Sequence, residues 1–387
     1  MDTNDKAKLL KELNEVKLLV GGTEFGGWKS VRIDAGIDRL SRTFDLEVTN
    51  NWPGNTEIVS RIKQGDEVQV MIGGDVVVTG YVDEIPIRYD AKTYTVGIKG
   101  RSKTADLVDC CPETDVDQFA DVIGPKGTAK RTKKAVTQWH KAKLEKIAEY
   151  LVEPYGIKVF TQVDTGDDLI GFALASDETV FEVIDRMVRK RQVLVTDTAL
   201  GDLMILDAGS GGRCTTALEL GRNILTGSAA LDYKDVFSKY VCYGSLAGTP
   251  ETENMENCAE YHSGSLSVVT SKLIGRRRVL VKHLSGQTYP SECSDVAIYE
   301  RSHREGKALE TYYTVSGWRE ENYTLWQPNK LVRVRDALIG FDVDMLIVGV
   351  SWVMDASGQR TELKVGPCNG YLVKGSNDQG KGWSDVH

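Results

Sequence analysis

The 387-residue chain has 41% hydrophobic and 27% charged residues, a balance typical of a soluble globular protein with roughly two to four domains. Its 48 basic and 56 acidic residues give a net charge of −8, which excludes a chain-wide electrostatic footprint for nucleic acid but not a local basic patch. No apolar run reaches the roughly 18 residues of a membrane span, and the N-terminus lacks the apolar centre of a secretion signal. Seven scattered cysteines indicate reduced thiols and not a disulfide framework.

The N-terminal part of the chain predicts a β module. Residues 1–15 are charged and mildly amphipathic and are expected to form a frayed helix or a flexible segment. Apolar alternation between Gly, Pro and Asp turns then predicts strands at residues 16–20, 31–35, 44–49, 68–70, 76–82 and 94–98. Ser102 is expected to cap a short helix over residues 103–108.

Residues 110–213 predict an α/β segment. One helix is expected at 137–150, and a second begins at 176–178, where an acidic first turn suits the helix dipole. Residues 193–196 and 203–206 predict a β-hairpin.

A basic run at residues 126–146 holds eight basic residues and one acidic residue. It can be interpreted as a nucleic-acid patch or as a solvated or partner-facing surface. Trp139 is the only aromatic residue in the run and no known binding motif is present, which favours the second interpretation.

The C-terminal half returns to a β pattern. Residues 218–248 and 279–284 predict strands, 248–264 a surface loop and 295–309 a helix. Strands expected at 331–334, 345–353 and 361–365 then repeat the order of strand, strand, turn and strand found at 68–98. The repeat predicts two related β modules, although antiparallel modules also share such an order by chance.

Motifs for catalysis are absent from the sequence, which contains no HExxH, CxxC, GxSxG or phosphate-loop spacing. Cys258 and His262, four residues apart, are the nearest candidate for a zinc site, with His283 or Cys293 as a possible further ligand. That spacing needs a helix, and the surrounding Asn, Gly and Ser residues do not favour one, so zinc is not expected.

Two other clusters also favour an ordinary structural role. Asp164, Asp167 and Asp168 lack the glycine and glutamate positions of a calcium loop and predict a solvated turn. The neighbouring Cys110 and Cys111 predict one buried and one exposed thiol and not a redox pair. We therefore expect no catalytic, cofactor-binding or metal-binding residues.

Several segments, in their order along the chain, resemble the baseplate hub proteins of contractile-tailed phages, in particular the Mu-like P-type tail protein family. The points of likeness span residues 16–367 and are VGGTEFGGWKSVRI, FDLEVTNNWP, GRSKTADLVDC, SDETVFEVIDRM, GRNILTGSAALDYKDVFSKYVCYG, LWQPNKLVRVRD and LIVGVSW. The resemblance implies a set of structural signature residues, namely Trp28, Trp52, Pro53, Trp318, Trp326, Pro328 and Asn329.

The resemblance implies an α+β, mainly β fold, with two similar β-barrel domains and inserted α/β segments. The expected parts are a flexible N-terminal segment, a first barrel, peripheral α/β material, a second and discontinuous barrel, and a flexible tail. Their boundaries are, in that order, 1–15, 16–109, 110–213 with 248–314, 214–247 with 315–367, and 368–387.

The function that the resemblance implies is structural, without enzymatic turnover or a cofactor. Three subunits would form a ring that adapts the sixfold tail tube to the threefold central spike. The expected partners are two further copies of the chain, the spike protein, the tail tube and other baseplate proteins. The expected location is the virion tail baseplate, reached from the host cytoplasm as a late protein. The alternative is a spike-complex module of a related contractile secretion system or a tail-derived bacteriocin.

DNA would pass through such a ring without being bound specifically. A channel that carries DNA must not trap phosphates with free cations. The net charge of −8 therefore predicts a neutral to acidic lumen, with residues 126–146 outside it.

Overall fold

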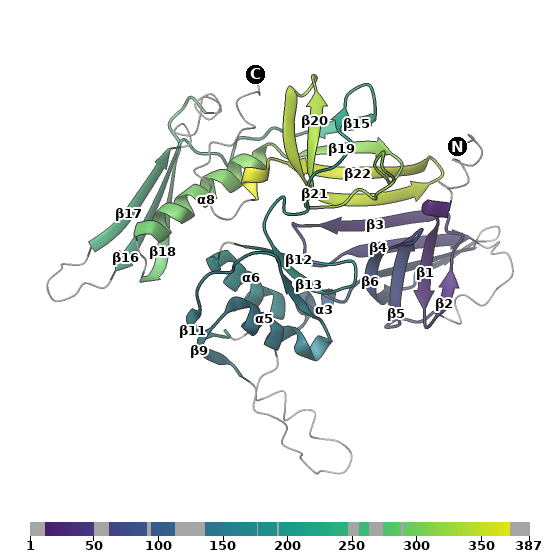
Figure 1. Ribbon diagram of the computed structural model, residues 1–387, viewed down its shortest axis with the longest axis horizontal. Coiled ribbons are helices and arrows are strands. Elements are labelled where there is room, and N and C mark those ends of the chain that lie inside the picture. Colours follow the sequence, from purple (N-terminus) through teal and green to yellow (C-terminus); the bar gives the residue numbers. More distant parts are fainter. Residues whose placement is uncertain are drawn as a thin grey trace, which may run out of the picture. The chain divides into compact units, whose positions relative to one another are not determined.

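A computed structural model of the protein describes residues 12–49, 62–90, 94–112, 136–175, 177–191, 193–246, 255–262, 274–287 and 290–371. The chain divides into two compact units, shown in Figure 1, which contain residues 1–33 with 38–206 and residues 34–37 with 207–387. The described helices include none that is long and apolar enough to cross a membrane.

The first unit begins with a β-sheet whose hydrogen-bonded order is β2, β1, β5, β6, β8, β4 and β3, with β7 paired to β8. Side chains alternate between the two faces of a strand, and Leu18, Leu46, Val70 and Ile98 are fully buried. The strands confirm the six segments expected here and are β1 Val16–Val20, β2 Thr23–Phe25, β3 Ser30–Gly36, β4 Thr43–Thr49, β5 Glu67–Ile72, β6 Asp75–Glu84, β7 Ile87–Tyr89 and β8 Tyr94–Ser102.

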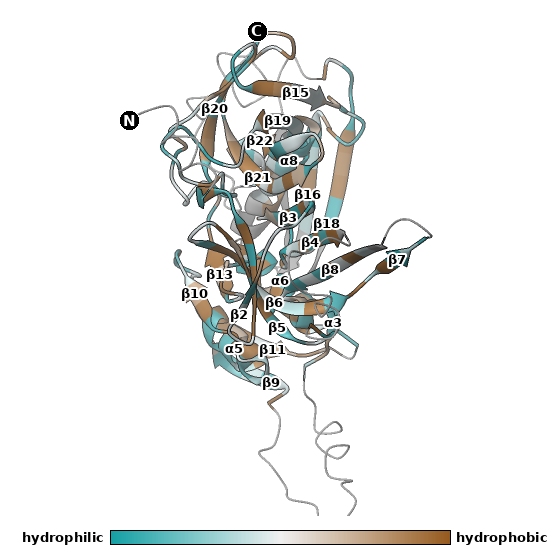
Figure 2. Ribbon diagram, turned by 90° about the vertical axis from the view of Figure 1, so that its right-hand side faces the viewer, coloured by the Kyte–Doolittle hydropathy of each residue, from teal (hydrophilic) through white to brown (hydrophobic). Residues whose placement is uncertain are grey.

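Two features of this sheet differ from the expectation. Strand β7 is an addition, and Figure 2 shows it extending with the start of β8 away from the rest of the sheet. The expected cap at Ser102 is wrong, because Ser102 ends β8 and Thr104 precedes the helix α3 Ala105–Asp109. The Ser102 hydroxyl is instead 2.8 Å from the Thr104 hydroxyl, inside a buried polar cluster.

The rest of the first unit is an α/β lobe. Its elements are β9 Gln138–Ala142, α5 Leu144–Val152, η1 Glu153–Tyr155, β10 Val159–Thr161, β11 Leu169–Ala173, α6 Val180–Arg191, β12 Leu194–Asp197 and β13 Leu203–Leu206. Buried side chains at helical spacing, among them Ile147, Leu151, Ile184 and Met187, form its core. The hairpin expected at 193–206 is confirmed by the antiparallel pairing of β12 and β13.

The two helix starts expected in this lobe are wrong. Residues 138–142 form β9, which pairs with β11, and Trp139 lies 6.2 Å from Phe172 between ring centroids. This aromatic contact across the pair overrides the helical pattern, so α5 begins only at Leu144. Helix α6 begins after Thr179, whose hydroxyl accepts the Glu182 N–H at 3.2 Å while the Glu182 carboxylate accepts the Thr179 N–H at 2.8 Å, a capping box.

The second unit contains another large sheet and a smaller lobe. The sheet holds β14 Leu218–Glu219, β15 Ile224–Ala229, β19 Thr311–Ser316, β20 Leu331–Asp336, β21 Phe341–Asp355 and β22 Gly358–Gly366. The lobe holds β16 Lys239–Leu246, β17 Met255–His262, β18 Val279–Gln287 and α8 Pro290–Ala308, and η3 Cys368–Gly370 follows the sheet. The surface loop expected at 248–264 is wrong for residues 255–262, because β17 pairs with β16 along its whole length.

Helix α8 covers one face of the sheet β17-β16-β18, as Figure 1 shows. It begins at Pro290, earlier than the expected residue 295, and proline is well suited to a first helical position. The segment after β22 is attached to α8. His303 Nδ1 lies 3.1 Å from the Gly370 carbonyl, to which it donates, and a Cβ on Gly306 would lie 2.3 Å from the Gly370 Cα.

The two large sheets have corresponding strand orders. The first contains β1, β5, β6, β8, β4 and β3, and the second contains β14, β20, β21, β22, β19 and β15. The lobe with α8 is inserted between β15 and β19, which correspond to β3 and β4. The first pair differs, since β1 is antiparallel to β5 whereas β14 is parallel to β20. Among the described residues, no pairing closes either sheet into a barrel.

The backbone contact between β6 and β8 leaves no room for a side chain at Gly80. A Cβ there would lie 1.8 Å from the Arg101 carbonyl oxygen and 2.6 Å from the Ser102 Cα. We expect Gly80→Ala to lower the free energy of unfolding by about 1–3 kcal/mol, measured by urea denaturation, because backbone must move. Gly74 is the control, since a Cβ there meets nothing within 4 Å. Equal stability of Gly80→Ala and Gly74→Ala would contradict this packing.

Candidate functional site

Most of the expected signature residues lie in the core of their own unit. Trp28 is buried in the first unit, and Trp318, Trp326 and Asn329 are buried in the second, with Pro328 half-buried. Trp52 and Pro53 lie outside the described residues.

The segment 318–329 is a loop built around these side chains. Trp318 Nε1 donates to the carbonyl oxygens of Val353 at 3.0 Å and Arg360 at 3.1 Å, at the end of the β21–β22 hairpin. The Trp326 backbone N–H donates to the Trp318 backbone carbonyl at 3.1 Å. The loop is thereby attached to the sheet at the point where β21 and β22 turn.

Glu320 anchors the same loop from inside. Its carboxylate is buried and accepts the Thr215 N–H at 2.6 Å and the Thr215 hydroxyl at 2.9 Å, and it lies 3.4 Å from Lys330 Nζ. The loop is therefore fixed to the segment that precedes β14.

Asn329 closes the loop in a left-handed backbone conformation, with φ of 65°. Its Oδ1 accepts the Gly209 N–H at 2.7 Å, and its Nδ2 donates to the Asp207 carbonyl at 3.1 Å and to the Ser210 hydroxyl at 2.9 Å. Its own N–H donates to the Ile347 carbonyl at 2.8 Å. Asparagine suits the site because it tolerates positive φ and bonds to nearby backbone.

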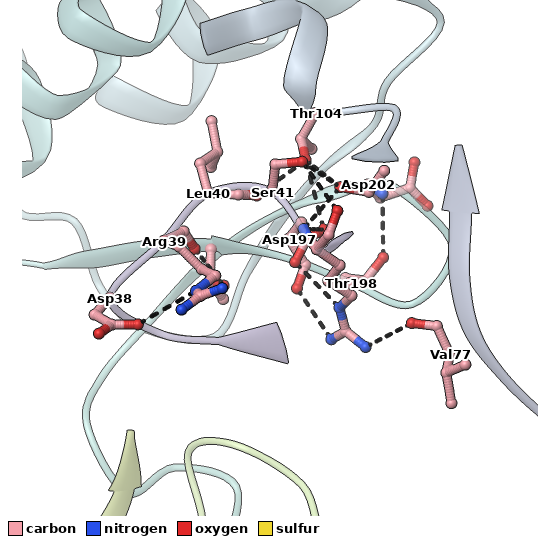
Figure 3. Close-up of polar contacts among 12 residues, drawn as sticks. Asp38, Arg39, Leu40, Ser41, Val77, Thr104, Asp197, Thr198 and Asp202 are labelled. Carbon is pink, nitrogen blue, oxygen red and sulfur yellow. Dashed lines mark hydrogen bonds and ion pairs between the residues drawn. The ribbon is translucent and has the colours of Figure 1, made fainter. Parts of the chain in front are cut away.

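A buried ion pair, drawn in Figure 3, connects the sheet and the α/β lobe of the first unit. The Arg42 Nε donates to Asp197 Oδ1 at 3.1 Å, and the Arg42 backbone N–H donates to Oδ2 at 3.1 Å. Arg42 Nη1 also donates to the Val77 carbonyl at 3.0 Å. The side chains of Arg42 and Asp197 are 14% and 1% exposed, so water screens the pair poorly.

Hydroxyl groups complete the polar cluster around this ion pair. Thr104 Oγ1 donates to the Leu40 carbonyl at 2.9 Å, and Ser102 Oγ accepts the Arg42 N–H at 3.1 Å. Burial raises the pKa of the Asp197 carboxyl, while the charge of Arg42 acts in the opposite direction. Sequence reasoning missed the pair because 155 residues separate its members, and Asp197 lies just after the expected strand at residues 193–196.

The exposed side of β14, β20 and β21 carries charges in neutralising pairs. We call it the arginine–carboxylate face, and it consists of Arg213, Arg222, Arg333, Arg335, Glu219, Glu321, Asp342 and Asp344. The Arg213–Asp344 and Arg333–Asp342 pairs have contacts of 2.8 and 2.7 Å. Hydrogen bonds from Arg222 and Arg335 lower the pKa of Glu219. Four cations and four carboxylates leave this face with no net charge.

The other candidates from the sequence are the possible zinc, calcium and thiol clusters. The described residues contain no group of three or more His, Cys, Asp or Glu that could hold a metal ion. Cys258 and His262 both lie on strand β17 and not on the helix that their spacing would need. Asp164 accepts the Gly166 N–H at 3.0 Å, as in a turn.

The remaining two features are exposed or only partly described. Cys110 and Cys111 follow α3 and are both exposed, so the expectation that one of the two is buried is wrong. Of the basic run, residues 126–135 lie outside the described residues, and Lys141 and Lys146 pair with Asp168 at 3.6 Å and Glu149 at 2.6 Å.

Three family models match successive parts of the chain. Residues 15–102 match the N-terminal domain of the Mu phage baseplate assembly protein GpP-like model. Residues 131–207 match the second domain of the baseplate hub protein gp44-like model. Residues 289–374 match the fourth domain of the Mu phage baseplate assembly protein GpP model.

Whole proteins of phages and prophages are similar along nearly the full chain. The baseplate hub protein gp44 of Escherichia phage Mu is 29% identical over 372 residues, which cover 95% of this chain and 91% of that protein. The 43 kDa tail protein of prophage MuSo2 from Shewanella oneidensis has a TM-score of 0.77 and 30% identity, covering 92% and 99% of the two chains. The tail protein from Neisseria meningitidis MC58, at 17% identity, shares the fold, with a TM-score of 0.74 and coverage of 94% and 98%.

Removal of the Asp197 charge tests the buried ion pair. We expect Asp197→Asn to lower the free energy of unfolding by roughly 2–4 kcal/mol, because the Arg42 guanidinium stays largely buried without its counterion. Asp109→Asn is the matched control, since Asp109 pairs with Arg101 at 2.7 Å on the surface and the change should cost less than about 1 kcal/mol. Urea titration at pH 7 measures both. A loss no larger than that of the control refutes the role of the pair.

Truncation of Asn329 tests the loop. Asn329→Ala removes three side-chain hydrogen bonds and places a Cβ residue at positive φ, so we expect a loss of about 2–4 kcal/mol in thermal or urea unfolding. Asn322→Ala, on the exposed part of the same loop, should cost less than about 1 kcal/mol. Similar losses for the two variants would show that Asn329 does not hold the loop.

Proposed function

Because the chain belongs to the family of Mu-like phage baseplate hub proteins, we propose that three copies form a ring in the baseplate of a contractile tail. The ring adapts the sixfold tail tube to the threefold central spike and leaves a channel for DNA. Its partners are the spike protein, the tail tube and other baseplate proteins. Assembly takes place in the host cytoplasm, and the protein remains in the virion tail.

The corresponding strand orders of the two large sheets carry this proposal. A chain that contains two similar β modules presents six modules in a ring of three, so a threefold object offers a sixfold surface to the tube. The orders β1-β5-β6-β8-β4-β3 and β14-β20-β21-β22-β19-β15 support such a duplication. The two modules are similar barrel-like domains, with boundaries at residues 16–109 and at 214–247 with 315–367.

Segments outside these two modules form the periphery. They are the α/β material at residues 110–213 and the lobe within 248–314, and the chain ends at residues 1–15 and 368–387 also belong to neither module. The signature residues that we expect from the family act by holding loops to the sheets, and the bonds of Trp318 and Asn329 support this role.

The charges suit passage of DNA without retention. Three chains with a net charge of −8 carry −24 together. A lumen for DNA is neutral to acidic, and the basic run at residues 126–146 lies outside it, because each free cation would add salt-dependent affinity for phosphate. The arginine–carboxylate face meets this requirement, since carboxylates neutralise its four arginines.

The role is structural and involves no turnover. The matching family models are of baseplate proteins, and we propose that affinity and geometry, rather than chemistry at a reactive group, were selected.

The mass of the particle in solution tests the ring. We expect light scattering after gel filtration to give three times the 42.7 kDa chain mass for the hub alone, or three hub chains plus three spike chains when the spike protein of the same tail is present. The spike protein should co-purify with the hub at one chain of each kind. A single-chain mass in the presence of the spike protein would exclude the trimeric ring.

A further inference from the structure

The two large sheets agree residue by residue along β6 and β21. Strand β6 has a bulge after Val82 in its pairing with β8, and β21 has one after Ile347 in its pairing with β22. The Gly65 N–H donates to the Val82 carbonyl at 2.8 Å, and the Asn329 N–H donates to the Ile347 carbonyl at 2.8 Å. Both donor residues have positive φ. Val82 and Ile347 therefore occupy equivalent positions.

The bulge fixes the equivalence of the residues that follow. Counting from it, Asp83 corresponds to Val348 and Pro86 corresponds to Ser351. The correspondence continues into β7, which pairs with β8 in the register in which the end of β21 pairs with β22. A contact made at this edge of β21 therefore has a defined counterpart position at the edge of β6 and β7.

The edge of β21 carries a short added segment of the second unit, Asp34–Ile37. The Ile37 N–H donates to the Val348 carbonyl at 2.9 Å, and the Ser351 hydroxyl donates to the Asp34 carboxylate. The equivalent edge of β6 and β7, beyond the bulge, pairs with none of the described strands. The first sheet thus leaves unpaired an edge that the second sheet has paired.

Strand β15, the counterpart of β3, is an unprotected edge strand. It pairs with β19 alone among the described strands. Residues 224–231 contain no charged side chain, and Leu225 and Leu231 are 59% and 46% exposed. Proteins usually protect an edge strand with charges or proline, so an uncharged edge with exposed leucines indicates that another strand covers it.

The register identifies the residue of β15 that matches the added segment. The Lys29 N–H, at the start of β3, donates to the Glu47 carbonyl at 2.9 Å. The residue of β19 that is equivalent to Glu47 pairs with Thr226 of β15. Asp34 lies five residues after Lys29, and Leu231 lies five residues after Thr226. Leu231 is therefore the counterpart of Asp34.

We propose that the end of β15 in one copy of the chain pairs with the open edge of β6 and β7 in the next copy, with Leu231 against Pro86. The inference rests on the proposed function, because a ring of three supplies the neighbouring copy. The polar contact between Asp34 and Ser351 is replaced at this boundary by an apolar one, since both of its counterparts are apolar. One such contact at each of three boundaries closes the ring through main-chain pairing.

Cross-linking between two introduced cysteines tests the contact. The test variant is Pro86→Cys with Leu231→Cys, in a chain in which Cys110→Ser and Cys111→Ser remove the exposed thiols. A disulfide forms only where the two Cα atoms approach within roughly 7 Å. We expect mild oxidation to give a covalent trimer, three times the chain mass, on a denaturing gel without reductant. Added reductant should return the single chain.

Pro86→Cys with Leu338→Cys, in the same serine background, is the matched control. Leu338 is 84% exposed in the turn between β20 and β21, so its thiol is more accessible than one at position 231. It does not lie on β15, and we expect the control to remain a single chain on the same gel.

The outcomes separate the contact from the ring. A test variant that is trimeric by light scattering but forms no covalent trimer overturns the inference while the ring stands. Equal cross-linking of the control also overturns it, because random collision then accounts for the product. A disulfide within one chain overturns it as well. A wild-type protein that is monomeric alone and with the spike protein refutes the proposed function, and the inference with it.

Discussion

Burial of one face of each antiparallel ladder is the constraint on which both large sheets depend. Side chains alternate along a strand, so a slip of one residue would turn the apolar set toward water. Val332 on β20 and Met345, its partner on β21, are both buried in the second sheet, as is Leu363 on β22, which holds these strands in one register. The loops at the sheet ends are placed by this register. Trp318 Nε1 reaches the carbonyls of both Val353 and Arg360 because these two residues are paired in the register of β21 and β22.

The strands were largely predictable from the sequence, and the reason is the same alternation. Patterns at 16–20, 44–49 and 361–365 are local and need no partner to be recognised. Two of the failures occurred where a distant contact overrode local preference. Residues 138–142 have a helical pattern but pair with β11, and Ser102 belongs to a polar cluster and not to a helix cap.

Positions of polar groups in the candidate site were the least predictable part. No spacing rule links Arg42 to Asp197, and burial of an ion pair is visible only after folding. Asn329, in contrast, follows Pro328 in a turn-like segment, where a residue of positive φ is unsurprising. The role of some stabilising side chains, such as Asn329, can therefore be predicted from the neighbouring sequence. The contacts of others, such as Arg42 and Asp197, arise only when the fold brings distant segments together.

Charge is used differently inside and outside the protein. The Arg42–Asp197 pair is buried and links the sheet and the α/β lobe of the first unit. The arginines of the arginine–carboxylate face are accessible to water, and neighbouring carboxylates neutralise them. Neither arrangement offers the unpaired, perturbed groups that usually mark a reactive centre. Both suit a protein whose surfaces must meet large partners.

The lobe with α8 leaves the second sheet after β15 and returns at β19, and these two strands are hydrogen-bonded neighbours, with Ala229 opposite Thr311. The two ends of the inserted lobe are therefore adjacent, and the entropic cost of closing such an insertion grows only slowly with its length. Related proteins can therefore carry a different, larger or smaller insertion at this position, or none, while β15 and β19 keep their pairing. Diversity among relatives should accumulate there sooner than in the strands on either side.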